Sequence, residues 1–138
     1  MIKEVATAFV GLYNSTPGGD ALRSCLPGGL YFSQAPENTE GTYGVFSWES
    51  SEIDEVMGSA DDRIETVSVV VSLFSKETDG GDAVFKAADA FMSLYDWATL
   101  TYTDLGHVAC RRVRASNVGL EDEYWQVDLN YELTFTGD

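Results

Sequence analysis

The chain is 138 residues long and strongly acidic, with 23 Asp and Glu residues against 8 Lys and Arg residues and a formal net charge of −15. This charge argues against a surface that binds nucleic acid or anionic lipid, since both kinds of surface need Lys and Arg to face phosphates. The length suits one domain, residues 1–138, with a core of its own, and no apolar run is long enough to cross a bilayer.

The cysteines and the N-terminal residues indicate where the protein is made. Cys25 and Cys110 lie far apart in the sequence and form no CxxC pair, so we expect reduced thiols and a cytosolic origin. The first residues include Glu4 and contain no small-residue cleavage site, so they are not expected to act as a signal peptide.

Short elements separated by Pro and Gly turns are predicted in the first part of the chain. Apolar residues spaced three and four apart predict a helix over residues 2–13, which Pro17 and the glycines beside it end. A single helical turn is expected after Asp20, which can cap it. Short strands are expected over Leu30–Ser33 and over Thr42–Ser50. The second strand has apolar side chains on both faces, which is typical of a strand covered on both sides, in part by another subunit.

Acidic residues dominate the stretch from Glu49 to Glu65, where Arg63 alone carries the opposite charge. This composition predicts a solvated loop. A site for a hard cation such as Ca²⁺ is the alternative, but the spacing lacks the DxDxDG pattern and the late Glu of a calcium-binding loop. The solvated loop is the preferred interpretation. Its acidic side chains are Glu49, Glu52, Asp54, Glu55, Asp61, Asp62 and Glu65.

Regular alternation and a wide apolar stripe mark the second half of the chain. Side chains alternate between two faces over Arg63–Lys76 and, most clearly, over Glu123–Thr136, which predicts two long strands. Ala83–Tyr95 carries the stripe expected of the principal helix. A short strand is expected around Leu100–Thr103, and a third long strand over His107–Val118.

A short polar connection joins the last two long strands, so they are expected to pair as a hairpin. No internal repeat or low-complexity linker divides the chain. With its strands gathered around one major helix, the sequence predicts an α+β fold. We expect a mainly antiparallel β-sheet with the principal helix and the N-terminal helix packed on one face.

Residues with catalytic potential are few and lack the partners that catalysis needs. His107 is the only histidine and stands beside a turn, with no GxSxG motif in the chain and no activating context at either cysteine. The Gly pairs fit no phosphate-binding pattern and are expected to make turns. We therefore predict no catalytic residue, no cofactor and no metal ligand. A hydrolase using His107 with a carboxylate is the weakest alternative.

Three of the eight basic residues fall within four positions of the third long strand. Strict alternation places Arg112 and Arg114 on one face and Arg111 on the other. Two interpretations stay open: the arginines pair across the hairpin with the polar face of the last strand, or with the acidic loop of a neighbouring copy. The side chains across the hairpin are Asp128, Asn130 and Glu132. The predicted subunit or partner interface comprises Arg111, Arg112, Arg114, Glu52, Asp54, Glu55, Asp61 and Asp62.

The order of these parts resembles the tail-terminator, or tail-completion, proteins of long-tailed bacteriophages. The features that carry the resemblance are an Ala-Pro loop after a short strand, a Tyr-x-Val-Phe strand, a Val-rich strand ending in Phe-Ser-Lys, an Ala-rich helix and a closing Trp-x-Val-x-Leu-x-Tyr strand. They stand here at Leu30–Pro36, Tyr43–Phe46, Val69–Lys76, Ala83–Tyr95 and Trp125–Tyr131. An acidic insert at residues 50–62 departs from the pattern.

The resemblance implies a non-enzymatic structural protein of the virion tail or neck, assembled in the host cytoplasm. Such proteins form a homo-oligomeric ring, here expected to be a hexamer, which caps the tail tube, ends its polymerisation and offers a joining surface to the head. The implied partners are further copies of the chain, the tail tube protein and the head–tail connector protein. DNA passes through an acidic lumen without sequence-specific binding, and no membrane is involved. The alternatives are a neck connector or head-completion protein and, after it, a cation-binding α+β module using the acidic loop 49–62.

Overall fold

The computed structural model describes residues 2–37, 39–55, 63–76, 78, 80–102, 106–116, 119–121 and 123–137. Of residues 2–5, 49–55, 63–65, 101–102, 106–108, 119–121 and 135–137 the backbone alone is described. The helices are α1 (Ile2–Tyr13), α2 (Asp20–Cys25) and α3 (Gly81–Tyr95). The strands are β1 (Gly29–Phe32), β2 (Tyr43–Glu55), β3 (Arg63–Lys76), β4 (Thr99–Tyr102), β5 (Gly106–Ala115), β6 (Gly119–Glu121) and β7 (Tyr124–Gly137).

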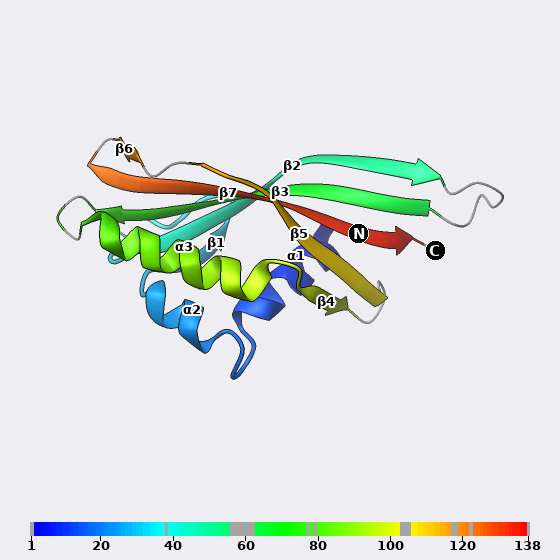
Figure 1. Ribbon diagram of the computed structural model, residues 1–138, viewed down its shortest axis with the longest axis horizontal. Helices are drawn as coiled ribbons and strands as arrows, with labels where there is room; N and C mark the ends of the chain where they lie inside the picture. Colours follow the sequence, from blue (N-terminus) through cyan, green and yellow to red (C-terminus); the bar gives the residue numbers. More distant parts are fainter. Residues whose placement is uncertain are drawn as a thin grey trace.

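The described strands form one seven-stranded sheet in the order β1-β2-β3-β7-β5-β4, with β6 paired to β7 outside this path. Every pairing among them is antiparallel except that of β1 with β2, which is parallel. The three helices lie on one side of the sheet (Figure 1). The predicted α+β fold, with helices on one face of a mainly antiparallel sheet, is confirmed.

The two strands with the clearest alternation form the centre of the sheet. β3 and β7 pair along their whole length, from Arg63 opposite Gly137 to Lys76 opposite Tyr124. Alternate side chains of both strands are buried beneath the helices, because successive residues of a strand point to opposite faces. The buried side chains are Val67, Val69, Val71, Leu73, Val127, Leu129, Tyr131 and Leu133.

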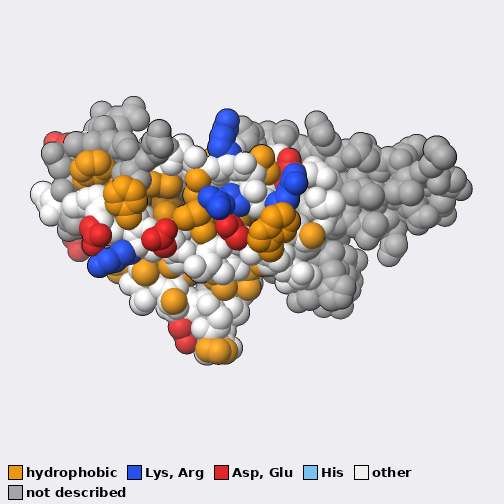
Figure 2. Space-filling model, in the orientation of Figure 1, with side chains coloured by type: hydrophobic (Ala, Val, Ile, Leu, Met, Phe, Trp, Pro, Cys, Tyr) orange, Lys and Arg blue, Asp and Glu red, His pale blue; other side chains and the backbone are white. Residues whose placement is uncertain are grey.

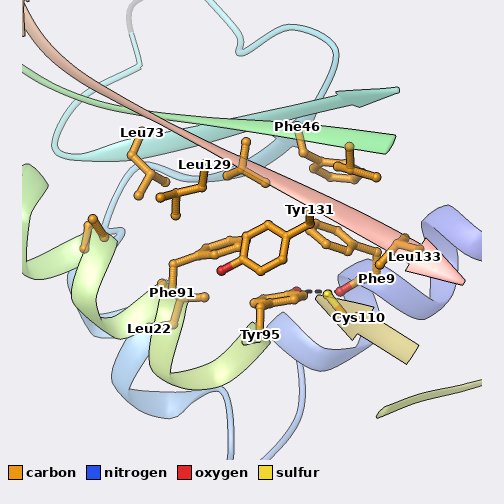
Figure 3. Packing of buried hydrophobic residues seen from close by; sticks show 14 of the residues in the cluster. Phe9, Leu22, Phe46, Leu73, Phe91, Tyr95, Cys110, Leu129, Tyr131 and Leu133 are labelled. Atoms are coloured by element: carbon orange, nitrogen blue, oxygen red, sulfur yellow. Dashed lines mark hydrogen bonds between the residues drawn. The ribbon is translucent and has the colours of Figure 1, made fainter. Parts of the chain in front are cut away.

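An aromatic cluster joins α1 and α3 beneath the sheet (Figure 3). The ring of Tyr95 in α3 lies 4.3 Å from that of Phe91 and 4.6 Å from that of Phe9 in α1, measured between centroids. The Tyr95 hydroxyl also donates a hydrogen bond of 2.5 Å to the backbone oxygen of Phe9. Each aromatic pair contributes about 0.5–1.5 kcal/mol beyond the burial of its area, so the cluster fixes α1 against α3.

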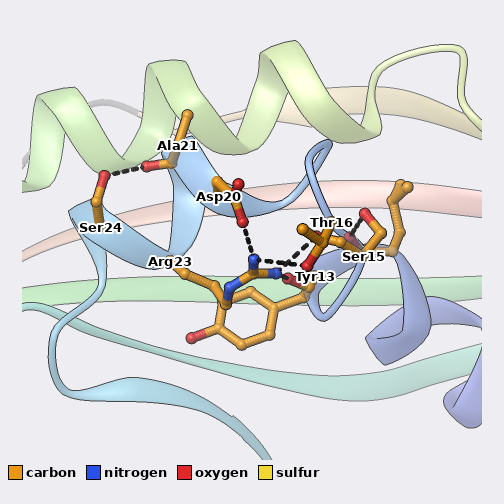
Figure 4. A network of polar contacts seen from close by, with 8 residues as sticks. Tyr13, Ser15, Thr16, Asp20, Ala21, Arg23 and Ser24 are labelled. Atoms are coloured by element: carbon orange, nitrogen blue, oxygen red, sulfur yellow. Dashed lines mark hydrogen bonds and ion pairs between the residues drawn. The ribbon is translucent and has the colours of Figure 1, made fainter.

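One arginine holds the connection between α1 and α2 (Figure 4). Arg23 Nη1 donates hydrogen bonds of 2.6 Å to the backbone oxygen of Tyr13 and 2.8 Å to that of Ser15. Its Nη2 forms an ion pair with Asp20. The carbonyl group of Tyr13 at the end of α1 therefore gains a charged donor, and the oxygen of Ser15 accepts from Arg23 in addition to the Gly19 N–H. A Cβ on Gly19 would lie 2.3 Å from the Tyr13 oxygen, so only glycine permits this close approach.

The structure corrects the expectation of a loop from Glu49 to Glu65. β2 continues well past the predicted end at Ser50, and its backbone pairs with β3 as far as Glu55 opposite Arg63. The predicted loop is therefore wrong for residues 49–55, whereas residues 63–65 belong to the strand that was predicted over Arg63–Lys76. The ladder continues because β3, itself held by β7, satisfies the backbone groups of β2 whatever the polarity of the side chains. Residues 56–62 lie outside the described residues.

Other predicted elements are confirmed with small shifts of their ends. α1 spans Ile2–Tyr13, and the hairpin of the last two long strands forms between β5 and β7. Their connection, expected as a turn, contains the short strand β6, which pairs with the start of β7. No helix in the described parts of the chain has the length and apolar character needed to span a membrane.

Candidate functional site

A register shift in β5 decides where its three arginines point. Arg111 lies opposite Glu132 and Arg112 opposite Tyr131, but after the shift Arg114 lies opposite Asn130. Glu132 and Asn130 belong to the face of β7 that points away from the helices, whereas Tyr131 is buried on the helix side. The prediction that Arg112 and Arg114 share a face is therefore wrong, because the β-bulge between them breaks strict alternation.

The outward-facing arginines differ in their partners. Arg111 Nη2 donates a hydrogen bond of 2.8 Å to Glu132 Oε2, which forms the cross-strand ion pair that was one of the two open interpretations. Both side chains are largely accessible to solvent, so the pair contributes only about 0.2–1 kcal/mol. Within the described residues Arg114 pairs with no carboxylate. Arg114 is therefore the arginine of this strand whose charge is available to a second molecule.

The inward-facing arginine meets a carboxylate that the sequence did not single out. Arg112 Nε donates a hydrogen bond of 3.0 Å to Asp96 Oδ2, and the Tyr131 hydroxyl donates one of 2.7 Å to Asp96 Oδ1. Burial first, and then this hydrogen bond to a carboxylate, raise the pKa of Tyr131 above its usual value of 10.0. Asp96 stands at the C-cap of α3, so it ties the end of the helix to β5 and β7.

Trp97 follows directly and is the most exposed of the large apolar side chains described. Its side chain is 78% exposed, and its backbone φ of 61° lies in the left-handed region. Both neighbours are fixed, Asp96 by its side-chain bonds and Ala98 by a backbone oxygen that accepts a 2.8 Å hydrogen bond from Cys110. No role was predicted for Trp97, which follows the predicted principal helix Ala83–Tyr95. The available signal was a large aromatic residue standing outside the apolar stripe.

An open apolar groove of about 690 Å³ runs between α1 and the β1–β2 edge of the sheet. Three aromatic side chains form its floor, with Phe32 5.4 Å from Phe46 and 6.2 Å from Trp48 between ring centroids. Phe32 is 52% exposed although it stands on this apolar surface. None of the described lining residues carries a charge. They are Ala6, Thr7, Val10, Gly11, Asn14, Phe32, Phe46 and Trp48.

The predicted acidic interface residues lie on a different strand from the arginines. The backbone of β2 places Glu52 opposite Thr66 of β3 and Glu55 opposite Arg63, with Asp54 between them. β3 and β7 separate β2 from β5, so the acidic and basic strands of one chain lie roughly 14 Å apart, three spacings of about 4.8 Å. Asp61 and Asp62 lie outside the described residues, as does the second half of the proposed cation loop, residues 56–62.

The face of the molecule that includes α3 shows charges of both signs close together. In the view of Figure 2, basic side chains lie beside acidic ones along the middle of this face, with apolar side chains exposed around them. β2, β3 and β7 extend together beyond the helices at one end of the molecule (Figure 1). The acidic part of β2 therefore belongs to a projecting end of the sheet rather than to the helix-covered core.

The described residues contain no arrangement suited to catalysis. Burial raises the pKa of the Cys110 thiol to about 12, so the thiol stays protonated at neutral pH and is a poor nucleophile. The side chain of His107 lies outside the description. No group of three His, Cys, Asp or Glu side chains that could hold a metal ion occurs in the part of the chain that is described.

Comparisons with known proteins identify a shared fold. No family model matches the sequence, and no curated protein matches it. The chain is similar to a chain of the virion of a native gene transfer agent particle, with a TM-score of 0.69 and 18% identity over 91% of this chain and 92% of that one. A second solved protein, which carries no descriptive name, has a TM-score of 0.62 and 12% identity over 98% and 95% of the two chains. At these identities the similarity shows the fold, and it extends over nearly the whole of each chain.

Proposed function

We propose that the chain is a structural virion subunit that forms a ring at the end of a tail tube, as tail terminators do. The observation that carries this proposal is the fold shared with a virion chain over 91% of this chain and 92% of that one. The shared fold therefore extends over nearly the whole of both chains. The order of sequence features that resembles tail terminators is independent of this structural likeness and supports the same role.

The charge of the molecule fits a ring through which DNA passes. A lumen lined with Lys and Arg would bind the phosphates of the duplex and slow its passage. A subunit with a net charge of −15 repels the duplex instead and needs no sequence-specific contact. The acidic lumen, and the absence of any enzymatic role, belong to this proposal.

The sheet offers two different edges for contacts between copies. β1 forms one edge and β4 the other, and both are short strands whose outer backbone groups have no ladder partner in the described sheet. Contacts between two different surfaces of identical subunits are head-to-tail and close into a ring when the rotation between copies allows. We propose a hexamer built in this way, with the tail tube protein on one face and the head–tail connector protein on the other.

The charged residues predicted as an interface differ in whether they already have a partner within the chain. Arg111 and Arg112 already have carboxylate partners within the chain, so Arg114 is the first arginine that a neighbouring copy can engage. The projecting acidic end of β2 in the next copy, with Glu52, Asp54 and Glu55, is the matching surface. Asp61 and Asp62 follow in the same segment of the sequence.

Tail tubes assembled in vitro test the proposed function. Added during assembly, the protein is expected to shorten the tubes, and electron microscopy should show a ring at one end of each. A lysozyme of similar size serves as the inert control. Tubes of unchanged length with bare ends, together with a protein that stays monomeric in light scattering, would show that the chain is not a tail terminator.

A neck connector or head-completion protein is the second candidate, because the similar chain belongs to a virion and its name does not place it in the tail. The two roles differ in the particle that binds the protein first. Headless tails that capture a labelled protein favour the terminator, whereas tailless heads that capture it favour the connector.

A further inference from the structure

The apolar groove and Trp97 are two unpartnered surfaces of opposite shape on one molecule. The groove is a concave surface of about 690 Å³, and none of the described residues that line it is charged. Trp97 is a convex one, an indole that is 78% exposed. A large aromatic side chain buries roughly 150–250 Å² when it enters a pocket. An indole in the groove would therefore remove apolar area of both surfaces from water.

The turn that carries Trp97 is built to present it. A non-glycine residue with a φ of 61° is strained and persists only where its surroundings hold it. Here Asp96 is fixed by Arg112 and Tyr131, and Ala98 is fixed by its hydrogen bond to Cys110. Because the backbone on both sides of Trp97 is already held in place, it loses little conformational entropy on binding, as is typical of an anchoring residue.

The two surfaces lie beside adjoining faces of α1, which meet at Thr7 and Gly11. The groove is bordered by α1 together with Phe32, Phe46 and Trp48 of β1 and β2. The adjoining face of α1 borders Thr99 and Leu100 of β4, the strand that follows Trp97. Within one chain Trp97 remains exposed, so it does not fill its own groove. A contact between these surfaces is therefore head-to-tail and leaves each copy with one free groove and one free indole for the next copies.

Electrostatics favour this pair of surfaces over most others. Two copies with net charges of −15 repel each other until an uncharged contact outweighs the repulsion. The described residues that line the groove are only apolar, Gly, Thr and Asn residues, so docking against these side chains buries no unpaired charge.

We propose that Trp97 of one copy docks in the α1–β1–β2 groove of the next copy and that this contact closes the ring. The inference rests on the proposed function for the existence of the ring, and it names the surfaces that join its subunits.

Two single substitutions each remove one half of the contact. Trp97→Ala removes the indole but keeps the groove. Gly11→Phe keeps the indole but fills the groove, and the added side chain is tolerated because a Cβ on Gly11 meets nothing within 4 Å. The matched controls are Phe85→Ala, which removes an aromatic side chain that is 53% exposed on α3, and Gly11→Ala, which adds one methyl group in the same open space. Circular dichroism verifies that all four variants are folded.

Sedimentation velocity gives the result. The wild-type chain and both controls are expected to form closed rings, whereas Trp97→Ala and Gly11→Phe stay monomeric with self-association weakened by about 100-fold or more, as for an aromatic hot spot. A mixture of the two defective variants is expected to form heterodimers and nothing larger, because one supplies the indole and the other the groove. Only a head-to-tail contact between these two surfaces gives that outcome.

The failures of the two proposals are distinguishable. Rings in either defective variant, a mixture that remains monomeric, or a wild-type chain that never self-associates would each overturn the docking of Trp97. If such rings still cap tail tubes, the proposed function stands without this contact. If the variants behave as expected but wild-type rings never bind tube ends, the contact stands and the tail-terminator role falls. Density for a helix of another virion protein in the groove of tube-bound rings would also overturn the self-contact.

Discussion

The side chain of Asp96 joins three elements, α3, β5 and β7. Its two carboxylate oxygens accept hydrogen bonds from Arg112 of β5 and Tyr131 of β7, while its backbone ends α3. Hydrogen bonds to charged groups are stronger than neutral ones, and losing one partner leaves the others unsatisfied. Asp96 therefore acts as a clamp between the principal helix and the sheet.

Replacing Asp96 by Asn keeps the shape of the side chain and removes its charge. We expect Asp96→Asn to lower the free energy of unfolding by about 1–3 kcal/mol, because Arg112 loses its charged partner and one oxygen becomes a donor. Urea unfolding followed by circular dichroism measures this change. Asp89→Asn, an exposed substitution on the same helix, is the control and should shift the value by less than about 0.5 kcal/mol. Equal effects of the two substitutions would contradict the clamp.

The buried thiol of Cys110 predicts a loss of stability in alkali. Burial raises its pKa from the ordinary value of 9.0 to about 12 in the folded protein, so between these pH values the unfolded chain loses a proton that the folded chain keeps. The stabilisation is complete below pH 9 and is lost as the pH rises towards 12. Tyr95 and Tyr131 act in the same direction above pH 10, because burial raises the pKa of each above 10.0.

Urea unfolding at a series of pH values checks this expectation. The free energy of unfolding should fall above pH 9, by at most about 1.4 kcal/mol per pH unit for each group involved. Cys110→Ala should flatten the profile between pH 9 and pH 10. A wild-type profile that stays flat from pH 8 to pH 10 would contradict the burial of the thiol.

At the scale of elements, α1 is held mainly through one aromatic side chain. Phe9 is fully buried and lies within 5.1 Å of Phe46 and 4.6 Å of Tyr95 between ring centroids, so it touches both the sheet and α3. α1 also forms one wall of the groove proposed for docking. The position of the groove wall therefore depends on a side chain inside the core.

Phe9→Ala should cost about 3–5 kcal/mol of unfolding free energy, because it leaves a cavity where three rings meet. Phe85→Ala, which truncates a half-exposed ring on α3, should cost less than about 1 kcal/mol. Both values come from urea unfolding at neutral pH. A Phe9→Ala variant as stable as Phe85→Ala would mean that α1 is not docked as described.

The sequence predicted those elements whose two faces differ in environment. β3 and β7 were found with nearly their observed ends because one face of each packs against helices, which makes apolar and polar residues alternate. The acidic part of β2 was missed because backbone pairing alone holds it there, and pairing leaves no pattern in the side chains. The bulge in β5 was missed for a similar reason, since a register shift depends on the partner strand.

The candidate site was predictable only in part. The cluster of arginines was visible because of its unusual density, but its faces and partners depended on the bulge and on Asp96, which lies on another element. Trp97 and the groove were missed: the sequence marked Trp97 only as an aromatic residue outside the apolar stripe, and exposure is a property of the folded surface and not of composition. The predicted contact of arginines with the acidic residues of a neighbouring copy stays a prediction.

At the scale of the whole molecule, the charge of −15 controls how copies approach each other. Salt screens repulsion between like-charged subunits and leaves an uncharged apolar contact almost unaffected. The salt dependence of assembly therefore reports which kind of contact dominates the ring.

Raising NaCl from about 0.1 M to about 1 M shortens the Debye length from about 10 Å to about 3 Å. We expect self-association to strengthen several-fold, measured as the concentration of half-assembly in sedimentation equilibrium. Arg114→Gln should weaken assembly slightly at low salt and not at high salt. Rings that dissociate as salt rises would instead indicate that pairs between arginines and carboxylates hold the copies together.

Val113 is the extra residue at the register shift in β5. It affects the curvature of the strand without interrupting the pairing of β5 with β7. The residues on either side of it meet consecutive partners, Arg112 opposite Tyr131 and Arg114 opposite Asn130, so the ladder would be continuous without it. What an inserted residue adds is local twist, which turns the β5–β4 edge relative to the centre of the sheet. In a ring joined through Trp97, which precedes β4, that turn sets the tilt from each subunit to the next. The number of subunits in the ring would then depend on one extra residue in one strand.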